Sequence, residues 1–290
     1  MNVLVTGVKG LLGHDALLAL IIRGHEAVGV DVEEMDITDG LAVEKVLRRI
    51  KPDAVIHCAA WTATDLAEDE ENRKSVYTVN ATGTENIARI CNELNCKMVY
   101  ISTDYVFDGQ GTQPWKPDDV CHPLNVYGWT KYKGEIAVEQ WLEKYFIVRI
   151  AWVFGVNGNN FVKTMLALGK NRKHITVVAD QIGTPTYTYD LSRLLVDLVE
   201  SVKYGRYHVT NEGGYISWYE FAKEILHQAA KLNDEYNDVT VSPVSSEVFS
   251  SKAKRPKNSR MCRQKLIDNG FTLLPTWQDA LCRYLKQIEV

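Results

Sequence analysis

The sequence contains a tyrosine and a lysine, Tyr127 and Lys131, at a spacing that could support proton transfer. Residues four apart lie on the same face of a helix, so the ammonium group would lie near the phenol. A neighbouring positive charge favours the phenolate, and we expect it to lower the pKa of Tyr127 from about 10 towards neutrality. The tyrosine could then donate or accept a proton as a general acid or base.

The same spacing recurs at Tyr219 and Lys223, so spacing alone does not identify a site. That second pair lies inside an amphipathic helical pattern, and we interpret it as surface and core packing. Context distinguishes the first pair, because Thr103 stands at the end of a strand-like apolar run upstream of it. Ligands bind at the carboxyl ends of strands in open parallel sheets, so we expect the Thr103 hydroxyl to lie beside Tyr127 and to face a substrate oxygen.

A glycine motif at the first strand–helix turn indicates a dinucleotide site. The apolar run 2–6 is followed directly by Gly7, Gly10 and Gly13, and then by a helical pattern. Glycines at such positions permit a tight turn, let the backbone approach a pyrophosphate, and let the helix pack against the strand. The free N–H groups at the start of the helix would bind the phosphates, so Leu11 and Leu12 belong to the same predicted site.

The residues after the second predicted strand bear on which dinucleotide binds. Asp31 ends that strand, where a carboxylate can accept hydrogen bonds from the adenosine ribose hydroxyls and would repel a 2′-phosphate. Lys9 in the glycine loop could instead pair with that phosphate. We give Asp31 more weight and expect the cofactor to be NADH, favoured over NADPH. Asp36, with Ile37 beside it, could reach the adenine edge or could serve to structure its own loop.

Strand-like and helical patterns alternate through residues 1–150, which predicts an α/β fold with a Rossmann-type doubly wound parallel sheet as the dinucleotide-binding domain. The strand runs are apolar throughout, as buried parallel strands should be. After residue 150 the alternation breaks down, and we expect residues 151–290 to form a smaller, mainly substrate-binding lobe whose chain could cross back to the sheet. The predicted strands are 2–6, 26–30, 54–57, 97–102, 146–150, 175–178, 205–209 and 239–244, and the predicted helices are 11–22, 40–50, 76–94, 126–141, 161–168, 190–201, 218–229 and 275–288.

Composition, charge and cysteine content indicate which class of protein this chain belongs to. Of 290 residues, 46% are apolar and 24% charged, which is ordinary for a soluble globular chain. A net charge of -4 gives no argument for a nucleic-acid partner. No membrane segment is expected, because the longest apolar run near the start, 16–22, is too short to span a bilayer. The six cysteines form no C-x-x-C pair, and with no export signal we expect reduced thiols and a cytoplasmic location. No metal site is assigned, since Asp15 and Asp190 are isolated carboxylates and a poor metal signal, and binding of a divalent ion between subunits stays open.

Taken together, these residues resemble the extended short-chain dehydrogenase/reductase family over essentially the whole chain. The resemblance rests on the glycine loop, the stretch 57–62 after the third strand, Asn80, Ser102 with Thr103, and the Tyr127–Lys131 pair. Five further blocks are similar, in the same order, to the family members that reduce nucleotide-linked keto sugars. They lie at 102–107, 123–128, 158–161, 180–186 and 255–260.

The resemblance implies further site residues. Thr103 and Asp104 would meet the sugar, and Trp152 would pack against it or serve as a core aromatic at a strand end. Arg255 would contact the diphosphate, although the five positive charges within 252–260 could also form a solvated basic segment. The cofactor would be lined by Ala60, Trp61, Thr62 and Ile101.

The expected reaction also follows from the resemblance. It is the NAD(P)H-dependent reduction of the C4 keto group of dTDP-4-dehydro-L-rhamnose to dTDP-L-rhamnose, a precursor of surface polysaccharide, so the partner is a dTDP-sugar substrate. Tyr127 would protonate the oxygen, Lys131 would bind the nicotinamide ribose, and Thr103 would donate a hydrogen bond to the same oxygen.

Three alternatives share parts of this pattern. A dehydratase is disfavoured, because Thr103 is followed by Asp104 and Tyr105 rather than by an Asp-Glu pair. An epimerase or another nucleotide-sugar reductase would have the same fold and the same Tyr127–Lys131 pair, and it stays open. A non-catalytic nucleotide-binding regulatory subunit also stays open, as does a homodimer.

Overall fold

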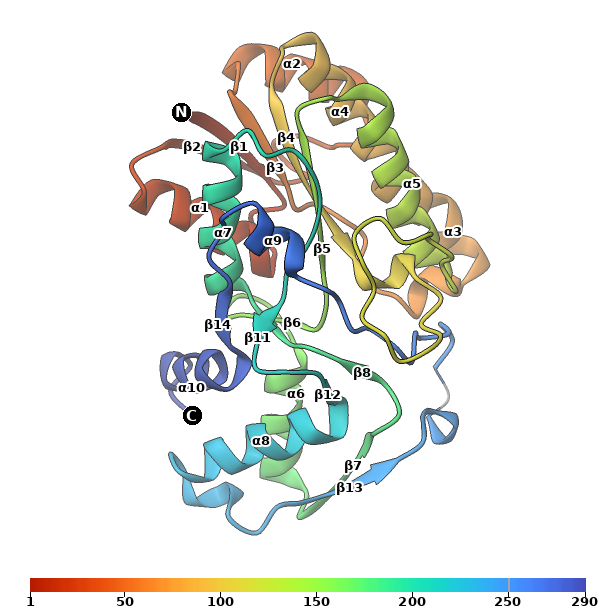
Figure 1. Ribbon diagram of the computed structural model, residues 1–290, viewed down its shortest axis with the longest axis vertical. Helices are drawn as coiled ribbons and strands as arrows, with labels where there is room; N and C mark the ends of the chain where they lie inside the picture. Colours follow the sequence, from red (N-terminus) through yellow and green to blue (C-terminus); the bar gives the residue numbers. More distant parts are fainter. Residues whose placement is uncertain (250) are drawn as a thin grey trace.

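The computed structural model describes residues 1–249 and 251–290, and its centre is a six-stranded sheet in which all neighbouring strands are parallel (Figure 1). The strand order is β2-β1-β3-β4-β5-β10. This confirms the predicted α/β fold class. The strands are β1 (Asn2–Thr6), β2 (Glu26–Val30), β3 (Ala54–His57), β4 (Lys97–Thr103), β5 (Tyr145–Ile150) and β10 (Gly205–His208).

Helices cover both faces of the sheet. One face packs against α1 (Leu11–Ile22) and α7 (Thr188–Glu200), and the other packs against α2 (Gly40–Ile50), α4 (Gly83–Glu93) and α5 (Val126–Trp141). Within β1, Val3 and Val5 enter one core and Leu4 enters the other. Because both faces are buried, the strands need apolar residues on both sides, which is why their sequence is continuously apolar.

The order of the strands opens a crevice at one edge of the sheet. The chain places β2 on one side of β1 and β3 on the other. In open parallel sheets such a reversal leaves room for a ligand outside the carboxyl ends of the strands. Thr103, the last residue of β4, stands at this edge and is paired with Ile150, the last residue of β5.

The segment predicted as one helix over 76–94 is interrupted in the structure. It consists of α3 (Glu70–Tyr77), a π-helical turn at Thr78–Thr82, and α4. The buried Asn80 accounts for the π turn, since its side chain accepts a hydrogen bond from the Trp61 N–H (2.8 Å) and donates one to Thr130 Oγ1 (3.0 Å). The expectation of a continuous helix is wrong because this polar side chain must reach the loop after β3, and π turns of this kind are common at functional sites.

The second half of the chain forms a lobe with its own apolar core, seen in the lower part of Figure 1. The core lies between α6 (Phe161–Asn171), α8 (Trp218–Ala230) and α10 (Trp277–Gln287). The same half also supplies strand β10 to the central sheet and helix α7, which packs on one face of that sheet. The division into two domains at residue 150 stays a prediction. The remaining elements are β6 (Val153–Phe154), β7 (His174–Val178), β8 (Ile182–Gly183), β9 (Thr186–Tyr187), β11 (Asn211–Glu212), β12 (Ile216–Ser217), β13 (Thr240–Val244), α9 (Gln264–Asp268) and β14 (Leu274–Thr276).

Two kinds of feature are absent from the part of the chain that the structure describes. It holds no helix that is both long and apolar enough to cross a membrane. It also holds no group of three or more histidine, cysteine, aspartate or glutamate side chains arranged to bind a metal ion.

Candidate active site

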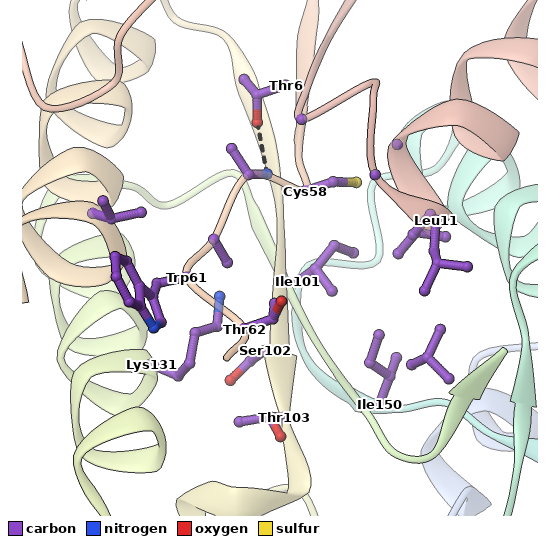
Figure 2. A pocket seen from close by; sticks show the side chains of 18 of the residues that line it. Thr6, Leu11, Cys58, Trp61, Thr62, Ile101, Ser102, Thr103, Lys131 and Ile150 are labelled. Atoms are coloured by element: carbon purple, nitrogen blue, oxygen red, sulfur yellow. Dashed lines mark hydrogen bonds between the residues drawn. The ribbon is translucent and has the colours of Figure 1, made fainter. Parts of the chain in front are cut away.

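A cavity of about 680 Å³ lies at the carboxyl ends of β1, β3, β4 and β5 (Figure 2). It gathers residues that are distant in sequence, from the glycine loop to the segment after β5. In Figure 2, Lys131 and Trp61 lie on one side of the cavity and Leu11 and Ile150 on the other. The predicted site residues that line it are Gly7, Gly10, Leu11, Leu12, Gly13, Asp31, Asp36, Ile37, Ala60, Trp61, Thr62, Ile101, Thr103, Asp104, Tyr127, Lys131 and Trp152.

The glycine loop forms a cradle that larger residues would fill. Gly7 has a φ of +70°, and a Cβ there would lie 2.7 Å from the backbone nitrogen of Ala59. A Cβ on Gly13 would lie 2.2 Å from the carbonyl oxygen of Gly7. Gly10, the N-cap of α1, brings no side chain to bond the first N–H groups of that helix. This close backbone approach at a helix N-terminus fits a dinucleotide pyrophosphate.

Carboxylates gather where the adenosine end of such a dinucleotide would lie. Asp31 Oδ2 accepts a hydrogen bond from the Lys9 N–H (3.0 Å), which fixes the carboxylate across the glycine loop. The Lys9 ammonium is paired with Glu33, and Glu34 accepts a hydrogen bond from the Asp31 N–H (2.9 Å). Asp36 Oδ1 accepts hydrogen bonds from the N–H and the hydroxyl of Thr38, so this carboxylate structures its own loop at the cavity wall. The local charge is therefore mainly negative.

The proton-transfer residues meet where α5 passes the end of β4. Asn125 caps α5 by accepting a hydrogen bond from the Gly128 N–H (2.8 Å), so the helix begins just before Tyr127. Thr103 is only 5% exposed and Lys131 only 3%. The Lys131 ammonium lies 4.2 Å from the centre of the Tyr100 ring.

The pKa values of this group differ from the prediction made for Tyr127. Burial raises the pKa of Tyr127 to about 12, and the hydrogen bond with Thr103 opposes this only in part. The expected fall towards neutrality is therefore wrong, because removing the phenolate from water outweighs any attraction to the lysine. Burial also lowers the pKa of Lys131 to about 7, with the carboxylate of Glu135 opposing the change. Tyr127 is thus a neutral phenol, suited to donating a proton.

Asp104 brings a second polar group to the same wall of the cavity. Its Oδ1 accepts a hydrogen bond from the Thr103 hydroxyl (3.1 Å), and burial raises the pKa of Asp104 to about 6, although this hydrogen bond opposes the rise. Its Oδ2 is buried and has no hydrogen-bond partner among the described residues. A buried polar atom without a partner is costly unless a ligand supplies one, so Asp104 is suited to holding a hydroxyl group.

Trp218 also lines the cavity, and the sequence analysis missed it as a site residue. It is the first residue of α8 and stacks on Trp152, with 3.7 Å between ring centres and 14° between planes. Only the fold brings these two residues together, so no spacing in the sequence could have revealed the pair. Tyr219 and Lys223 lie outside the cavity lining, and the ammonium lies over the phenol ring (5.4 Å), which agrees with a packing pair.

Arg255 is the one predicted site residue that lies outside this cavity. It lines a second hollow of about 750 Å³, together with Lys252, Lys254 and Lys257. The Arg255 guanidinium donates to Asp65 Oδ2 (2.8 Å), and Lys252 pairs with Asp69 (2.6 Å). Burial raises the pKa of Tyr105, a residue of the first cavity, and the positive charge of Arg255 opposes this rise, so Arg255 lies within electrostatic reach of that cavity.

Comparison with known proteins gives consistent matches over the whole chain. The family model described as RmlD substrate binding domain matches residues 1–290. The chain is 40% identical over 288 residues to the dTDP-4-dehydrorhamnose reductase of Aggregatibacter actinomycetemcomitans, and the match covers 97% of each chain. A solved dTDP-4-dehydrorhamnose reductase from Clostridium acetobutylicum has a TM-score of 0.94 and 40% identity, with 100% of both chains covered. The reductase from Bacillus anthracis, solved in complex with NADP, has a TM-score of 0.92 and 42% identity over 99% of this chain and 100% of its own.

Proposed function

Because the chain belongs to the RmlD substrate binding domain family, we propose that it is an NAD(P)H-dependent reductase that converts dTDP-4-dehydro-L-rhamnose into dTDP-L-rhamnose. The observation that carries this proposal is the convergence of Thr103, Tyr127 and Lys131 beside a glycine cradle in one cavity. The full-length similarity to dTDP-4-dehydrorhamnose reductases supports the choice of sugar. A homodimer and a cytoplasmic location stay predictions.

In the proposed mechanism, the nicotinamide supplies the hydride when it is bound, and the protein positions the groups around it. The cradle at Gly7 and Gly13, with the free N–H groups at the start of α1, would hold the pyrophosphate, and Lys131 would bind the nicotinamide ribose. Tyr127 donates its proton to the C4 oxygen as that oxygen gains negative charge, and the Thr103 hydroxyl turns to hydrogen-bond the same oxygen, stabilising the transition state.

A cofactor-oxidation assay tests the proposed function directly. The protein is incubated with dTDP-4-dehydro-L-rhamnose and either NADH or NADPH, and the product sugar is identified by NMR. We expect loss of the reduced cofactor and formation of dTDP-L-rhamnose. Interconversion of a UDP-sugar without net cofactor oxidation would favour an epimerase instead. Absence of turnover with any keto sugar, together with stable association with another enzyme, would favour a regulatory subunit.

We expect NADH to bind at least as well as NADPH, because the Asp31 carboxylate lines the cavity and Lys9 is already paired with Glu33. Asp31→Ala should weaken NADH binding more than NADPH binding, measured as Kd by quenching of protein fluorescence. Glu33→Gln provides the matched comparison, since it releases Lys9 and should improve binding of NADPH alone. If the unmodified protein bound NADPH tenfold more tightly than NADH, a difference of about 1.4 kcal/mol, the preference for NADH would be wrong. The Bacillus anthracis relative was solved in complex with NADP, so the comparison of the two cofactors is needed.

We expect Arg255 to move from Asp65 to the diphosphate of the nucleotide sugar, because its positive charge lies within electrostatic reach of Tyr105 at the first cavity. Arg255→Ala should raise KM for the sugar nucleotide by about tenfold or more, since a hydrogen bond to a charged group contributes about 1.5–3 kcal/mol. Its Kd for NADH should not change. Arg23→Ala, which removes an exposed guanidinium paired with Asp197, is the control and should leave both constants unaltered. An unchanged KM at low salt would instead support the alternative that residues 252–260 form a solvated basic segment with no role in substrate binding.

A further inference from the structure

We infer that Trp218 is a positioning residue for Trp152, and that the two stacked indoles form an apolar wall that selects sugars with a methyl group at C6. The inference rests on the proposed function in one respect only: it assumes that the C4 oxygen of the sugar lies at Thr103 and Tyr127.

The indoles of Trp152 and Trp218 stack on each other and line the cavity. Their ring centres are 3.7 Å apart and their planes differ by 14°, which is close stacking. The ring of Phe161 lies 4.5 Å from that of Trp218 at an angle of 53°, so Trp218 is held between two aromatic neighbours. Both tryptophans line the same cavity as Thr103 and Tyr127. The stack therefore faces the site from one side and the aromatic core of the lobe from the other.

The backbone of Trp152 is strained, and its surroundings hold it in that state. Its φ is +51°, a left-handed conformation that bulky residues rarely adopt. The Thr186 N–H donates to the Trp152 carbonyl (3.1 Å), and the Thr186 hydroxyl donates to the Ala151 carbonyl (2.6 Å). A Cβ on Gly183 would lie 2.9 Å from Cε2 of Trp152, so the indole is confined on that side as well. Strain that is held in place in this way is typical of ligand-binding positions.

Trp218 is itself placed by the local structure at the start of α8. The Ser217 hydroxyl accepts a hydrogen bond from the Glu220 N–H (3.1 Å), and the Glu220 carboxylate accepts one from the Ser217 N–H (2.7 Å). This capping box fixes the first residue of the helix. The preceding strand β12 pairs with β8, opposite Ile182 and Gly183. The pairing of β12 with β8 therefore fixes the positions of two residues that adjoin the Trp152 indole, namely Trp218 and Gly183.

The groups that line the cavity differ in chemistry, and this difference can orient the sugar. Thr103 pairs with Ile150 across the sheet, Trp152 follows Ile150 by two residues, and Thr103, Trp152 and Trp218 line the same cavity. Asp104 also lines it, and its Oδ2 has no partner within the described chain. A ring hydroxyl of the sugar can hydrogen-bond to Asp104. The C6 group is attached to C5, the ring neighbour of C4, and we expect it to meet the indoles, where a methyl packs and a hydroxymethyl would lose its hydrogen bonds to water.

The test compares two sugars in the reverse reaction: dTDP-L-rhamnose and its 6-hydroxy counterpart, dTDP-L-mannose, each with the oxidised cofactor. We expect the unmodified enzyme to favour the 6-deoxy sugar by about 100-fold in kcat/KM, the typical discrimination of an apolar pocket against an added hydroxyl. Trp218→Ala should reduce this preference about tenfold, the contribution of a stacked aromatic pair, without changing Kd for the cofactor. Trp218→Phe should lie between the two.

Two further variants separate a positioning effect from general damage. A Cβ in Gly183→Ala would press directly on the Trp152 indole and should reduce the preference in the same way, although Trp218 is intact. Trp141→Phe is the matched control, since Trp141 lies at the end of α5 with its indole N–H near Glu85, outside the cavity lining. It should retain the full preference.

Circular dichroism gives a readout that does not depend on turnover. Two stacked indoles produce an exciton couplet, which we expect in the unmodified protein and in Trp141→Phe but not in Trp218→Ala. If neither sugar is oxidised, the proposed function fails. The preference can then still be measured as the ratio of the Kd values for dTDP-L-mannose and dTDP-L-rhamnose, obtained from quenching of tryptophan fluorescence. A Trp218→Ala protein that folds, lacks the couplet and still discriminates fully between the sugars would overturn the inference.

Discussion

Replacing Tyr127 by phenylalanine should lower kcat by about 10²–10⁴-fold, the contribution typical of a positioned proton donor. Burial raises the pKa of Tyr127 to about 12, so the phenol carries its proton throughout the usual working range of pH. Without that hydroxyl, the C4 oxygen gains negative charge with no proton donor beside it, and the Thr103 hydrogen bond alone remains. The measurement is the steady-state rate of NADH oxidation with both substrates saturating.

The substitution removes one oxygen from a half-buried side chain that lines the cavity, so the fold and the affinity for NADH should be largely retained. Tyr219→Phe is the internal control, because Tyr219 has the same spacing to Lys223 but lies outside the cavity lining. It should remain active. Normal turnover by Tyr127→Phe with loss of turnover in Tyr219→Phe would transfer the catalytic assignment to the second pair.

The parts of the fold that sequence predicts well are those whose signals are local. The glycine loop stops β1 after Thr6 and starts α1 at Leu11, and both boundaries agree with the prediction. Asn125 starts α5 by bonding the Gly128 N–H, so Tyr127 and Lys131 share a helix as expected. In each case a strong cap or turn residue adjoins a periodic apolar pattern, and nothing distant in the chain competes with it.

The parts that sequence predicts poorly depend on partners far along the chain. Asn80 looks like an ordinary helix residue until the loop containing Trp61 is placed beside it. The charge of Arg255 looks free until Asp65 is brought within 2.8 Å. The pKa of Tyr127 is raised mainly because the folded cavity removes the phenol from water, and its spacing to Lys131 in the sequence cannot reveal this. Tertiary contacts therefore decide the chemistry of the site after local patterns have decided the elements.

A buried ion pair beneath the site is the clearest case of such long-range dependence. Arg149 on β5 and Glu135 on α5 are each only 1% exposed. The guanidinium donates to both carboxylate oxygens, from Nε to Oε1 (2.8 Å) and from Nη2 to Oε2 (2.7 Å). Glu135 also accepts a hydrogen bond from Ser102, the neighbour of Thr103, and lies one helical turn after Lys131. The pair thus joins the two elements that carry the catalytic residues.

Arg149→Met should destabilise the protein by about 3–5 kcal/mol, because it leaves the buried Glu135 carboxylate without its hydrogen-bonded ion-pair partner. The Pro117 carbonyl, which accepts a hydrogen bond from Arg149 (2.9 Å), also loses its donor. The measurement is the free energy of unfolding in urea. Adding Glu135→Leu to Arg149→Met should restore much of that loss, since a buried ion pair replaced by apolar residues often costs little.

Arg23→Met is the matched control, because Arg23 forms similar ion pairs with Asp197 and Glu200 at the exposed surface. Exposed pairs contribute about 0–1 kcal/mol, so this variant should remain close to the unmodified protein. A loss for Arg149→Met no larger than that for Arg23→Met would mean that water or a rearranged side chain satisfies Glu135. In that case the positions of Thr103 and Lys131 would depend on the backbone of β4 and α5 alone.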